Sequence, residues 1–378
     1  MASSPQGAYV AAGPQLEGLQ TVRGEVGPDR ANLLLYRPGG AALPAPPGDF
    51  TFVHPRAAVT PDGALHLVWA EPAMRADWGR ARDRRLVPLG SVWHAGWRSG
   101  RWSAPERIYR GARIKLEPVL SSALSVDASG GLHVGFPGED AAGMPRAVHV
   151  WHDGRGWHAS EIQSRVPPVY VDVLPLRAGR TLMAYVAGQN VGGRDYTNAL
   201  LVAASSDGGA TWSPPRTVGA PEHWPATEPR LVAGRDGAIH LVWLRGAMQG
   251  RAALWHASSR DGGRNWEEMR ELPLDGLPNG VQAVADARGA VHVVLTSYQQ
   301  RRPELLHASW VRGGWSRPEP LFAGRMGTQP SLRADAAGRL HLAWVAQVPG
   351  TILPARLAPG DTLPWFELDY AVADAGAP

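Results

Sequence analysis

The sequence contains no cysteine, so the chain can form no disulfide bond and offers no thiol for catalysis. No apolar run reaches the length of a membrane-spanning helix. The first twenty residues lack the basic and apolar regions of a signal peptide. We therefore expect no membrane span. If Met1 is native we expect a cytoplasmic protein, and if a leader was removed we expect a secreted or periplasmic one.

Charged residues make up only 19% of the 378 residues, and Lys115 is the single lysine. The formal net charge of +4 agrees either with a GC-rich genome or with an acidic ligand. Basic residues are scattered rather than clustered, which argues against nucleic-acid binding. No His, Asp or Glu cluster has metal-ligand spacing. We expect a monomer that binds a small-molecule or glycan ligand, acidic in one alternative, without a metal or another cofactor.

The chain is rich in turn-forming residues and in tryptophan, with 45 Gly, 34 Pro and 16 Trp. This composition is typical of many short strands joined by tight turns. Pro and Gly interrupt almost every window that could form a long helix. The sequence therefore predicts an all-β fold.

One unit recurs along the chain: a D-x-x-G or D-G turn, then a strand of the form L-H-L-V-W. The copies are Asp62–Trp69, Gly131–Val134, Asp236–Trp243, Gly289–Val294 and Gly338–Trp344, with a divergent copy at Gly179–Tyr185. A hairpin that ends in Trp follows each copy, at Trp102, Trp157, Trp212, Trp266, Trp315 and Trp365. The spacing of roughly fifty residues is that of a four-stranded propeller blade.

Two stretches share the pattern S-x-D-x-G-x-x-W, Ser205–Trp212 and Ser259–Trp266. The Asp can accept hydrogen bonds from backbone N–H groups of a turn, Gly supplies backbone angles that other residues resist, and Trp covers the hairpin. The pattern resembles the Asp-box, or BNR, repeat of sialidase-like β-propellers. This resemblance implies an architecture rather than a function, because the corner is a structural device.

We therefore predict a six-bladed β-propeller of four-stranded antiparallel blades over residues 50–378. Seven blades are less expected, because residues 16–50 are short for a blade. Residues 1–15 are expected to be disordered. Residues 16–49 are expected to form strands and a linker that either close the ring or cap it.

Five histidines occupy the same position of the repeated strand: His66, His133, His240, His292 and His341. A metal or catalytic site needs a few converging residues rather than one residue in each blade. The repetition therefore predicts a role in blade packing.

The resemblance implies a ligand site on one face, where loops enter each innermost strand and leave each second strand. Sialidases begin their first blade with an F-R-I-P motif whose Arg grips the substrate carboxylate. Here Val53 stands in that place. Arg56 follows closely, although regular strand alternation would aim its side chain elsewhere. The sialidase nucleophile is a Tyr, and Gln329 occupies its position.

Other parts of the sialidase constellation have counterparts in this chain. By the resemblance, Asp77 matches the acid/base aspartate and Glu228 matches the glutamate that activates the nucleophile. Arg245 and Arg301 match the second and third arginines. Hydrolysis of the sialidase type needs a phenolate, so we expect the fold to carry over and the sialidase activity not to.

Polar and aromatic residues of the ligand-face loops complete the candidate site. We predict as catalytic residues Asp77, Glu228, Tyr196 and His223. We predict as substrate-binding residues Arg56, Arg245, Arg301, Trp78, Trp224, Tyr298 and Gln329. Carboxylates, His and Tyr support general acid–base chemistry, whereas aromatic faces with polar groups equally suit sugar binding without chemistry.

Three functions stay open. The preferred one is a metal-independent, glycan-active enzyme, either a glycoside hydrolase that uses a carboxylate pair or a polysaccharide lyase that uses His and Tyr. The second is a non-catalytic lectin or interaction propeller. The third is a propeller recruited for small-molecule chemistry in a biosynthetic pathway.

Overall fold

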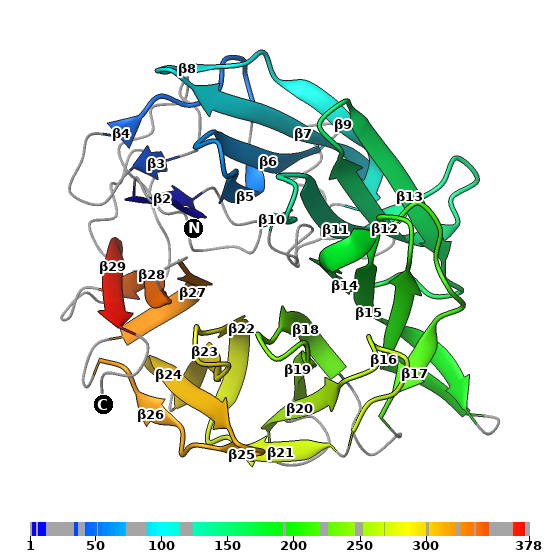
Figure 1. Cartoon of the computed structure of the whole chain (residues 1–378), viewed down its shortest axis with the longest axis vertical. Coiled ribbons are helices and arrows are strands. Elements are labelled where there is room, and N and C mark those ends of the chain that lie inside the picture. Colours follow the sequence, from blue (N-terminus) through cyan, green and yellow to red (C-terminus); the bar gives the residue numbers. More distant parts are fainter. Residues whose placement is uncertain are drawn as a thin grey trace, which may run out of the picture.

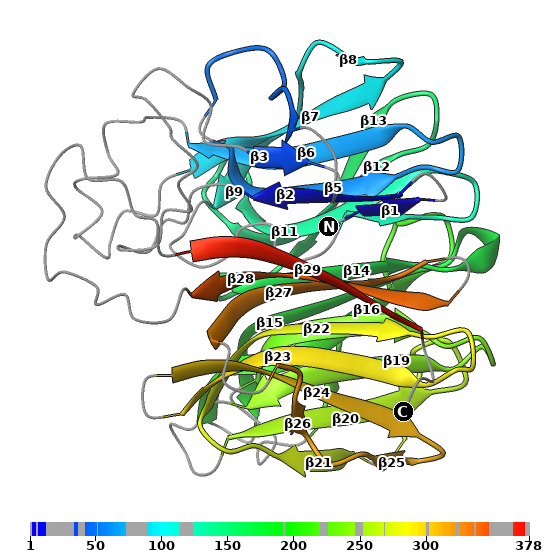
Figure 2. The same ribbon diagram turned by 90° about the vertical axis from the view of Figure 1, so that its left-hand side faces the viewer.

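The computed structural model describes residues 2–4, 7–12, 34–36, 42–50, 52–72, 89–113, 124–191, 194–219, 226–245, 252–267, 269–299, 302–322, 326–335, 338–347 and 366–374. In these ranges the chain forms antiparallel strands and one 3-10 turn, Arg177–Gly179, and no α-helix. The sheets are arranged in a ring around a centre (Figure 1). Their strands run largely along the ring axis (Figure 2). The prediction of an all-β fold is confirmed.

The N-terminal strands form a sheet of their own. It contains, in spatial order, β1 (Ala2–Ser4), β2 (Gly7–Ala12), β3 (Leu34–Tyr36) and β4 (Ala42–Leu43). Strand β1 contacts both β5 and β27, so this sheet lies between the first and last inner strands (Figure 1). Two strands therefore fall within residues 1–15, where the sequence predicted disorder.

The next sheet has nine strands and contains two repeats of the predicted unit. The first repeat contains β5 (Val53–Val59), β6 (Leu65–Pro72), β7 (Leu89–Arg98), β8 (Arg101–Trp102) and β9 (Glu106–Arg113). The second contains β10 (Ser125–Val126), β11 (Leu132–Glu139), β12 (Pro145–His152) and β13 (Trp157–Gln163). A single pairing of Gly138 with Ala112 joins them.

Four further sheets complete the ring. The first of them contains β14 (Tyr170–Pro175), β15 (Thr181–Val191), β16 (Arg194–Ser205) and β17 (Arg216–Val218), and the second contains β18 (Ala226–Ala233), β19 (Ile239–Arg245), β20 (Ala253–Ser259) and β21 (Arg270–Pro273). The third contains β22 (Leu277–Ala285), β23 (Val291–Gln299), β24 (Arg302–Val311), β25 (Gly314–Trp315) and β26 (Glu319–Pro320). The fourth contains β27 (Met326–Ala334), β28 (Arg339–Gln347) and β29 (Phe366–Asp374). The number of blades stays a prediction.

The hydrophobic core lies between neighbouring sheets. One cluster joins Leu200 and Val202 of β16 to Leu241 and Trp243 of β19, and the other clusters bridge adjacent sheets in the same way or lie within one repeat. Each repeat thus buries its apolar residues largely against the next one, which explains why the unit recurs. Among the described helices, none is long and apolar enough to cross a membrane.

Both Asp-box corners have the predicted geometry. Asp207 Oδ1 accepts the N–H of Thr211 at 2.9 Å, and Asp261 Oδ1 accepts the N–H of Asn265 at 2.9 Å. The Trp212 indole donates to Ser160 Oγ of the preceding repeat at 2.8 Å. The corner therefore links two neighbouring sheets as well as closing its own hairpin.

Four of the five repeated histidines pair with a second histidine on the third strand of their repeat. The ring nitrogens of His133 and His149 lie 3.0 Å apart, and the pairs His66–His94, His240–His256 and His292–His307 repeat this contact. His133 Nε2 lies 3.3 Å from the carboxylate of Asp127. If His133 donates there, its Nδ1 accepts from His149 Nε2, and both rings stay neutral. These contacts lie within the sheets, as a packing role requires.

Candidate functional site

The innermost strands of four repeats carry a β-bulge at the same place. Register shifts occur between Val53 and Arg56, Thr227 and Arg230, Asn279 and Gln282, and Thr328 and Ser331. The first bulged residue has a positive φ in each case: His54, Glu228, Gly280 and Gln329. A bulge inserts one residue and so reverses the face to which the following side chains point.

Three of these bulges have the form Xaa-Pro and lie opposite a buried tryptophan. Residues 54–55, 228–229 and 329–330 lie opposite Trp69, Trp243 and Trp344, which are at most 3% exposed. Pro precedes Trp by the same fourteen residues in each repeat (55 to 69, 229 to 243, 330 to 344). In the fourth repeat Leu295 lies opposite the Gly280–Val281 bulge. A large, buried indole ring therefore lies opposite each bulge that contains a proline, and a smaller side chain lies opposite the bulge that does not.

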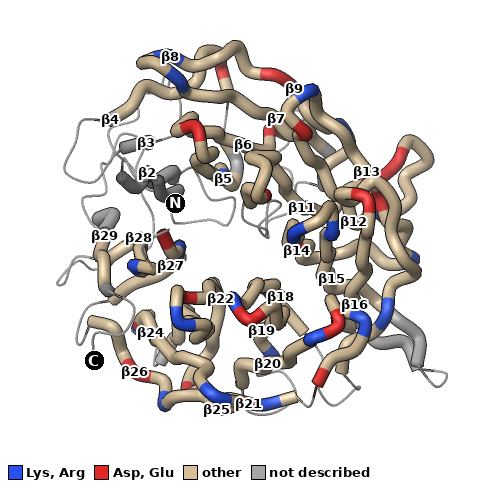
Figure 3. The backbone as a smooth tube through the Cα atoms, in the orientation of Figure 1, with Lys and Arg blue, Asp and Glu red and all other residues tan. Residues whose placement is uncertain are grey.

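Three arginines from these strands converge at the centre. Arg56 follows the bulge of β5, Arg230 follows that of β18, and Arg333 lies two residues beyond Ser331 on β27. All three are half-buried, and each donates from Nη1 to the carbonyl of the preceding residue, at 2.8–3.1 Å. These strands surround the centre of the ring and carry charged residues there (Figure 3). We call Arg56, Arg230 and Arg333 the central arginine cluster.

The three guanidinium groups repel one another. Burial and the charges of Arg230 and Arg333 lower the pKa of Arg56 to about 9. Burial and Arg230 lower the pKa of Arg333 to about 10. Among the described residues, no salt bridge joins Arg230 or Arg333 to a carboxylate. The cluster therefore stays cationic at neutral pH, and an anion placed there would relieve the repulsion.

Two carboxyl groups lie beside the cluster. Asp172 of β14 is 6% exposed, and its Oδ2 accepts the N–H of Leu231 at 2.7 Å. Burial raises its pKa to about 6, against the opposing charge of Arg230. Glu228 Oε1 and Oε2 accept the N–H groups of Gly280 at 3.1 Å and Val281 at 2.9 Å. Burial also raises the pKa of Glu228, although Arg230 and these donors oppose the rise.

The bulge changes the expectation for Arg56. Regular alternation along residues 52–56 would have aimed this side chain away from the site. The extra residue between Val53 and Arg56 shifts the register, and Arg56 interacts electrostatically with Arg230 and Arg333. Glu228 and Gln329 also lie at bulges of the inner strands, as the two positive φ angles record.

Two predicted substrate-binding residues lie farther out. Tyr298 is the second-to-last residue of β23, opposite Leu277 and at the same end of its sheet as the bulge, and is half-buried. The Arg245 guanidinium lies 3.5 Å from Glu271 on the outermost strand β21 and 5.7 Å from the centroid of the Trp255 ring. Its side chain therefore extends outward along its sheet, and Arg245 is not part of the central arginine cluster.

The remaining predicted residues cannot be related to this geometry. Outside the described residues lie Asp77, Trp78, His223, Trp224 and Arg301. Tyr196 lies in β16, opposite Gln189, but only its backbone is described. Within the described ranges, no three His, Asp or Glu side chains converge as a metal-binding group.

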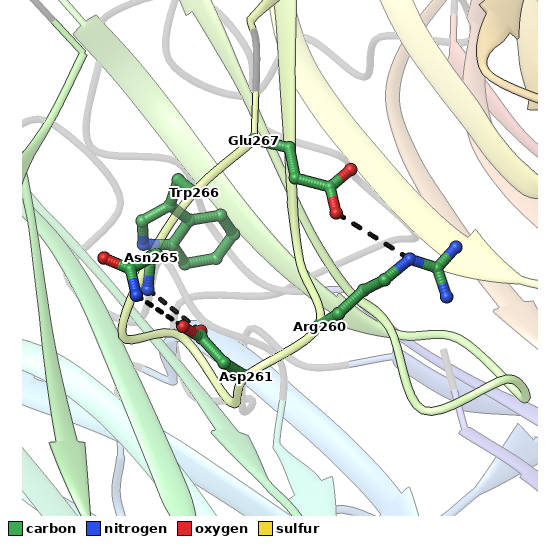
Figure 4. A pocket seen from close by; sticks show the side chains of 5 residues that line it. All are labelled: Arg260, Asp261, Asn265, Trp266 and Glu267. Carbon is green, nitrogen blue, oxygen red and sulfur yellow. Dashed lines mark hydrogen bonds and ion pairs between the residues drawn. The ribbon is translucent and has the colours of Figure 1, made fainter.

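A shallow pocket lies at the second Asp-box corner, away from the centre. Its lining residues are Arg260, Asp261, Asn265, Trp266 and Glu267 (Figure 4). Asp261 holds Asn265, and the Arg260 and Glu267 side chains pair at 3.7 Å. Because these polar groups bind one another, the pocket is part of the hairpin corner rather than a convergent ligand site.

Reasoning from the sequence missed Arg230 and Arg333 as site residues and left Asp172 out of the candidate set. The missed signal is the constant spacing of Xaa-Pro and Trp, which marks the bulges in three repeats. The residue after this Pro is Arg56 in the first copy and Arg230 in the second, whereas Arg333 lies three residues after Pro330. The convergence of these three with Asp172 depends on the closure of the ring.

Comparison with solved structures shows the fold. A protein of unknown function from Dyadobacter fermentans has a TM-score of 0.54 at 14% identity, over 81% of this chain and 93% of that one. The GH93 α-L-arabinofuranosidase of Fusarium graminearum, solved with arabinobiose, has a TM-score of 0.50 at 12% identity, over 87% and 95%. The NanB sialidase from Streptococcus pneumoniae has a TM-score of 0.47 at 11% identity, over 78% and 65%. None of the curated proteins matches the chain.

The family model described as a BNR repeat-like domain matches residues 52–272, which is more than half of the chain. The matched region begins at the bulged strand β5 and includes both Asp-box corners. The repeated hairpin corners, the ring of antiparallel sheets and this match agree with one another. The chain therefore belongs to the BNR repeat-like domain family, and its fold is that of the sialidase-like β-propellers.

Proposed function

We propose that this protein binds an acidic carbohydrate through the central arginine cluster. The observation that carries the proposal is the convergence of Arg56, Arg230 and Arg333 on the inner strands of three repeats. Guanidinium groups match the planar geometry of a carboxylate and stay charged when they are half-buried. The fold is shared with glycoside hydrolases, which supports a carbohydrate as the ligand.

We further propose that the activity is glycoside hydrolase-like, with Asp172 transferring the proton. A carboxyl group whose pKa is about 6 is partly protonated in mildly acidic solution and can serve as a general acid and then as a base. Its burial excludes water, and its neighbour Arg230 belongs to the group that would hold the substrate anion. Asp77, Tyr196 and His223 stay proposed as further catalytic residues.

A non-catalytic binding function is the second candidate, and one observation favours it. Both oxygens of Glu228 accept hydrogen bonds from backbone donors, and by the sialidase resemblance Gln329 stands where that family has its nucleophile. Among the described residues beside the cluster, Asp172 is then the remaining carboxylate, and it too accepts backbone hydrogen bonds, from Leu231 and Val173. A binding propeller needs the arginines and no second carboxylate.

Calorimetric titration with N-acetylneuraminic acid and galacturonic acid, against neutral galactose, tests the proposal. We expect the wild-type protein to bind one of the acids and not galactose. Arg230→Ala should weaken that binding at least about tenfold, since it removes a charge-assisted contact. Arg245→Ala is the matched control and should leave it unchanged. Equal effects of the two variants would overturn the proposal.

Turnover separates the two candidates. With aryl glycosides of the acid that binds, a glycoside hydrolase should release the aryl group, and Asp172→Asn should abolish the release without abolishing binding. Tight binding with no release from any of these substrates would favour the binding propeller instead.

A further inference from the structure

Both carboxylate oxygens of Glu228 accept hydrogen bonds from the neighbouring sheet. Oε1 accepts the N–H of Gly280 and Oε2 that of Val281, the two bulged residues of β22. A base that activates a nucleophile must direct one of its oxygens at that nucleophile. This carboxylate is instead the acceptor for two backbone donors that the bulge takes out of the β-ladder.

Glu228 itself sits in a costly backbone conformation. Its φ is 50°, which is uncommon for a residue with a side chain. Such a conformation persists where the surroundings over-determine it. Here the two bonds to β22 on one side and Pro229, packed opposite Trp243, on the other hold the bulge in place.

Arg230 is consequently held from both neighbouring sheets. Two residues before it, Glu228 is bonded to β22. One residue after it, the N–H of Leu231 is bonded to Asp172 of β14 at 2.7 Å. The backbone that presents Arg230 to the central arginine cluster is therefore fixed on both sides of the arginine.

We propose that Glu228 is a positioning residue, which locks the bulge of β18 to the bulge of β22 and thereby sets Arg230 in the central arginine cluster. The same bonds set Gln282, which follows the β22 bulge as Arg230 follows its own, and whose Nε2 donates to Val281 O at 3.0 Å. Glu228 thus acts through the side chains it positions. This role rests on the proposed function of the cluster and differs from the nucleophile-activating role that the sialidase resemblance implies.

The charge of Glu228 by itself predicts the opposite effect on anion binding. Glu228 is an acidic group near Arg230, so removing it should strengthen anion binding if its charge were its only contribution. If Glu228 positions Arg230, removing it should weaken anion binding. The sign of the change therefore distinguishes the two roles.

The experiment measures Glu228→Ala and Glu228→Gln with two readouts on the full chain. The first is amide hydrogen exchange of Gly280 and Val281 by NMR. The second is the Kd for N-acetylneuraminic acid or galacturonic acid, whichever the wild-type protein binds. We expect exchange at both amides to accelerate in Glu228→Ala and the Kd to rise about tenfold or more. Glu228→Gln retains one acceptor oxygen, so we expect intermediate changes, and it covers the case in which the Ala variant does not fold.

Several results would overturn the inference. Unchanged exchange at Gly280 and Val281 would show that the bonds do not hold the bulge. An unchanged or lower Kd in both variants would show that they do not position Arg230. Loss of turnover with an unchanged Kd would assign Glu228 to chemistry instead. If the wild-type protein binds neither acid, the proposed function fails, while the exchange readout still tests the lock.

Discussion

Asp172 of β14 accepts a hydrogen bond from the N–H of Leu231 in the next sheet, with 2.7 Å between Oδ2 and the nitrogen. This bond joins two inner strands and lies directly beside Arg230. Glu228 repeats the arrangement one sheet further on, toward Gly280 and Val281. Inner strands of three successive sheets are thus linked in one direction by carboxylate-to-backbone hydrogen bonds.

The ionisation of Asp172 should destabilise the fold. Burial raises its pKa from 3.8 to about 6, so the folded protein holds this proton more tightly than the unfolded chain does. The stabilising contribution is present below pH 3.8 and is lost as the pH rises through 6. The difference is at most on the order of 3 kcal/mol.

Asp172→Asn removes this titration while retaining an acceptor oxygen. In urea titrations between pH 4 and pH 7, we expect the unfolding free energy of the variant to rise relative to the wild-type protein as the pH rises. Asp207→Asn is the control: hydrogen bonds from Thr211 lower the pKa of that carboxyl, so its contribution to stability changes mainly below pH 4, and this variant should run nearly parallel to the wild-type protein between pH 4 and pH 7. A difference between Asp172→Asn and the wild-type protein that does not vary with pH would contradict the prediction.

The buried histidine pairs should make the protein sensitive to acid. Burial lowers the pKa of His149 and His256 to about 3 and that of His66 and His307 to about 4, with the neighbouring imidazole acting in the same direction. The unfolded chain binds these protons near pH 6.5, so stability is complete above that pH and falls below it. Each histidine contributes a slope of up to about 1.4 kcal/mol per pH unit.

A single variant tests this slope. His149→Gln removes one of the depressed groups, and the unfolding free energy measured in urea between pH 6.5 and pH 4.5 should fall less steeply by about one proton. The variant itself is expected to be less stable at pH 7, because it loses its contact with His133. Parallel pH profiles for the variant and the wild-type protein would contradict a buried neutral imidazole.

Trp243 should be critical for its volume and not for its indole nitrogen. The side chain is fully buried opposite the Glu228–Pro229 bulge, and its Nε1 has no hydrogen-bond partner among the residues that the structure describes. Trp243→Ala should cost about 3–5 kcal/mol of unfolding free energy through the cavity it leaves. Trp243→Phe should cost much less, since the lost N–H was unsatisfied. Equal losses in thermal or urea unfolding would show that cavity volume is not the cause.

Gly280 is required by its bulge, whereas Gln329 is tolerated in the equivalent place. Gly280 has a φ of 66°, and an added Cβ would lie 3.3 Å from Pro330 Cδ. Gly280→Ala should therefore destabilise the protein by roughly 1–2 kcal/mol. Gln329 has a φ of 54°, so Gln329→Gly should relieve strain and cost little. Urea unfolding of both variants checks the contrast, and a stable Gly280→Ala variant would contradict it.

Composition and repetition alone determined the fold class. A strand and its turn recur at a regular interval because each repeat buries its apolar face largely against the next one. Each repeat therefore needs the same apolar pattern over a few neighbouring residues, which can be recognised in the sequence. The Asp-box corners and the packing role of the repeated histidines could be predicted for the same reason. Asp207 and Asp261 form their hydrogen bonds within a few residues, and His133 forms its contact within one sheet. The family match over residues 52–272 agrees with that interpretation.

The site was decided by the tertiary structure. Arg56, Arg230 and Arg333 are far apart in the sequence, and only the closed ring of sheets brings them together. Their direction depends on bulges, each of which adds one residue and reverses the alternation from which a side chain's face is predicted. Glu228 shows the same limit, because its partners Gly280 and Val281 belong to the next sheet. Pairings between sheets leave no local pattern, so the role of this carboxylate follows from the fold and not from its place in a motif.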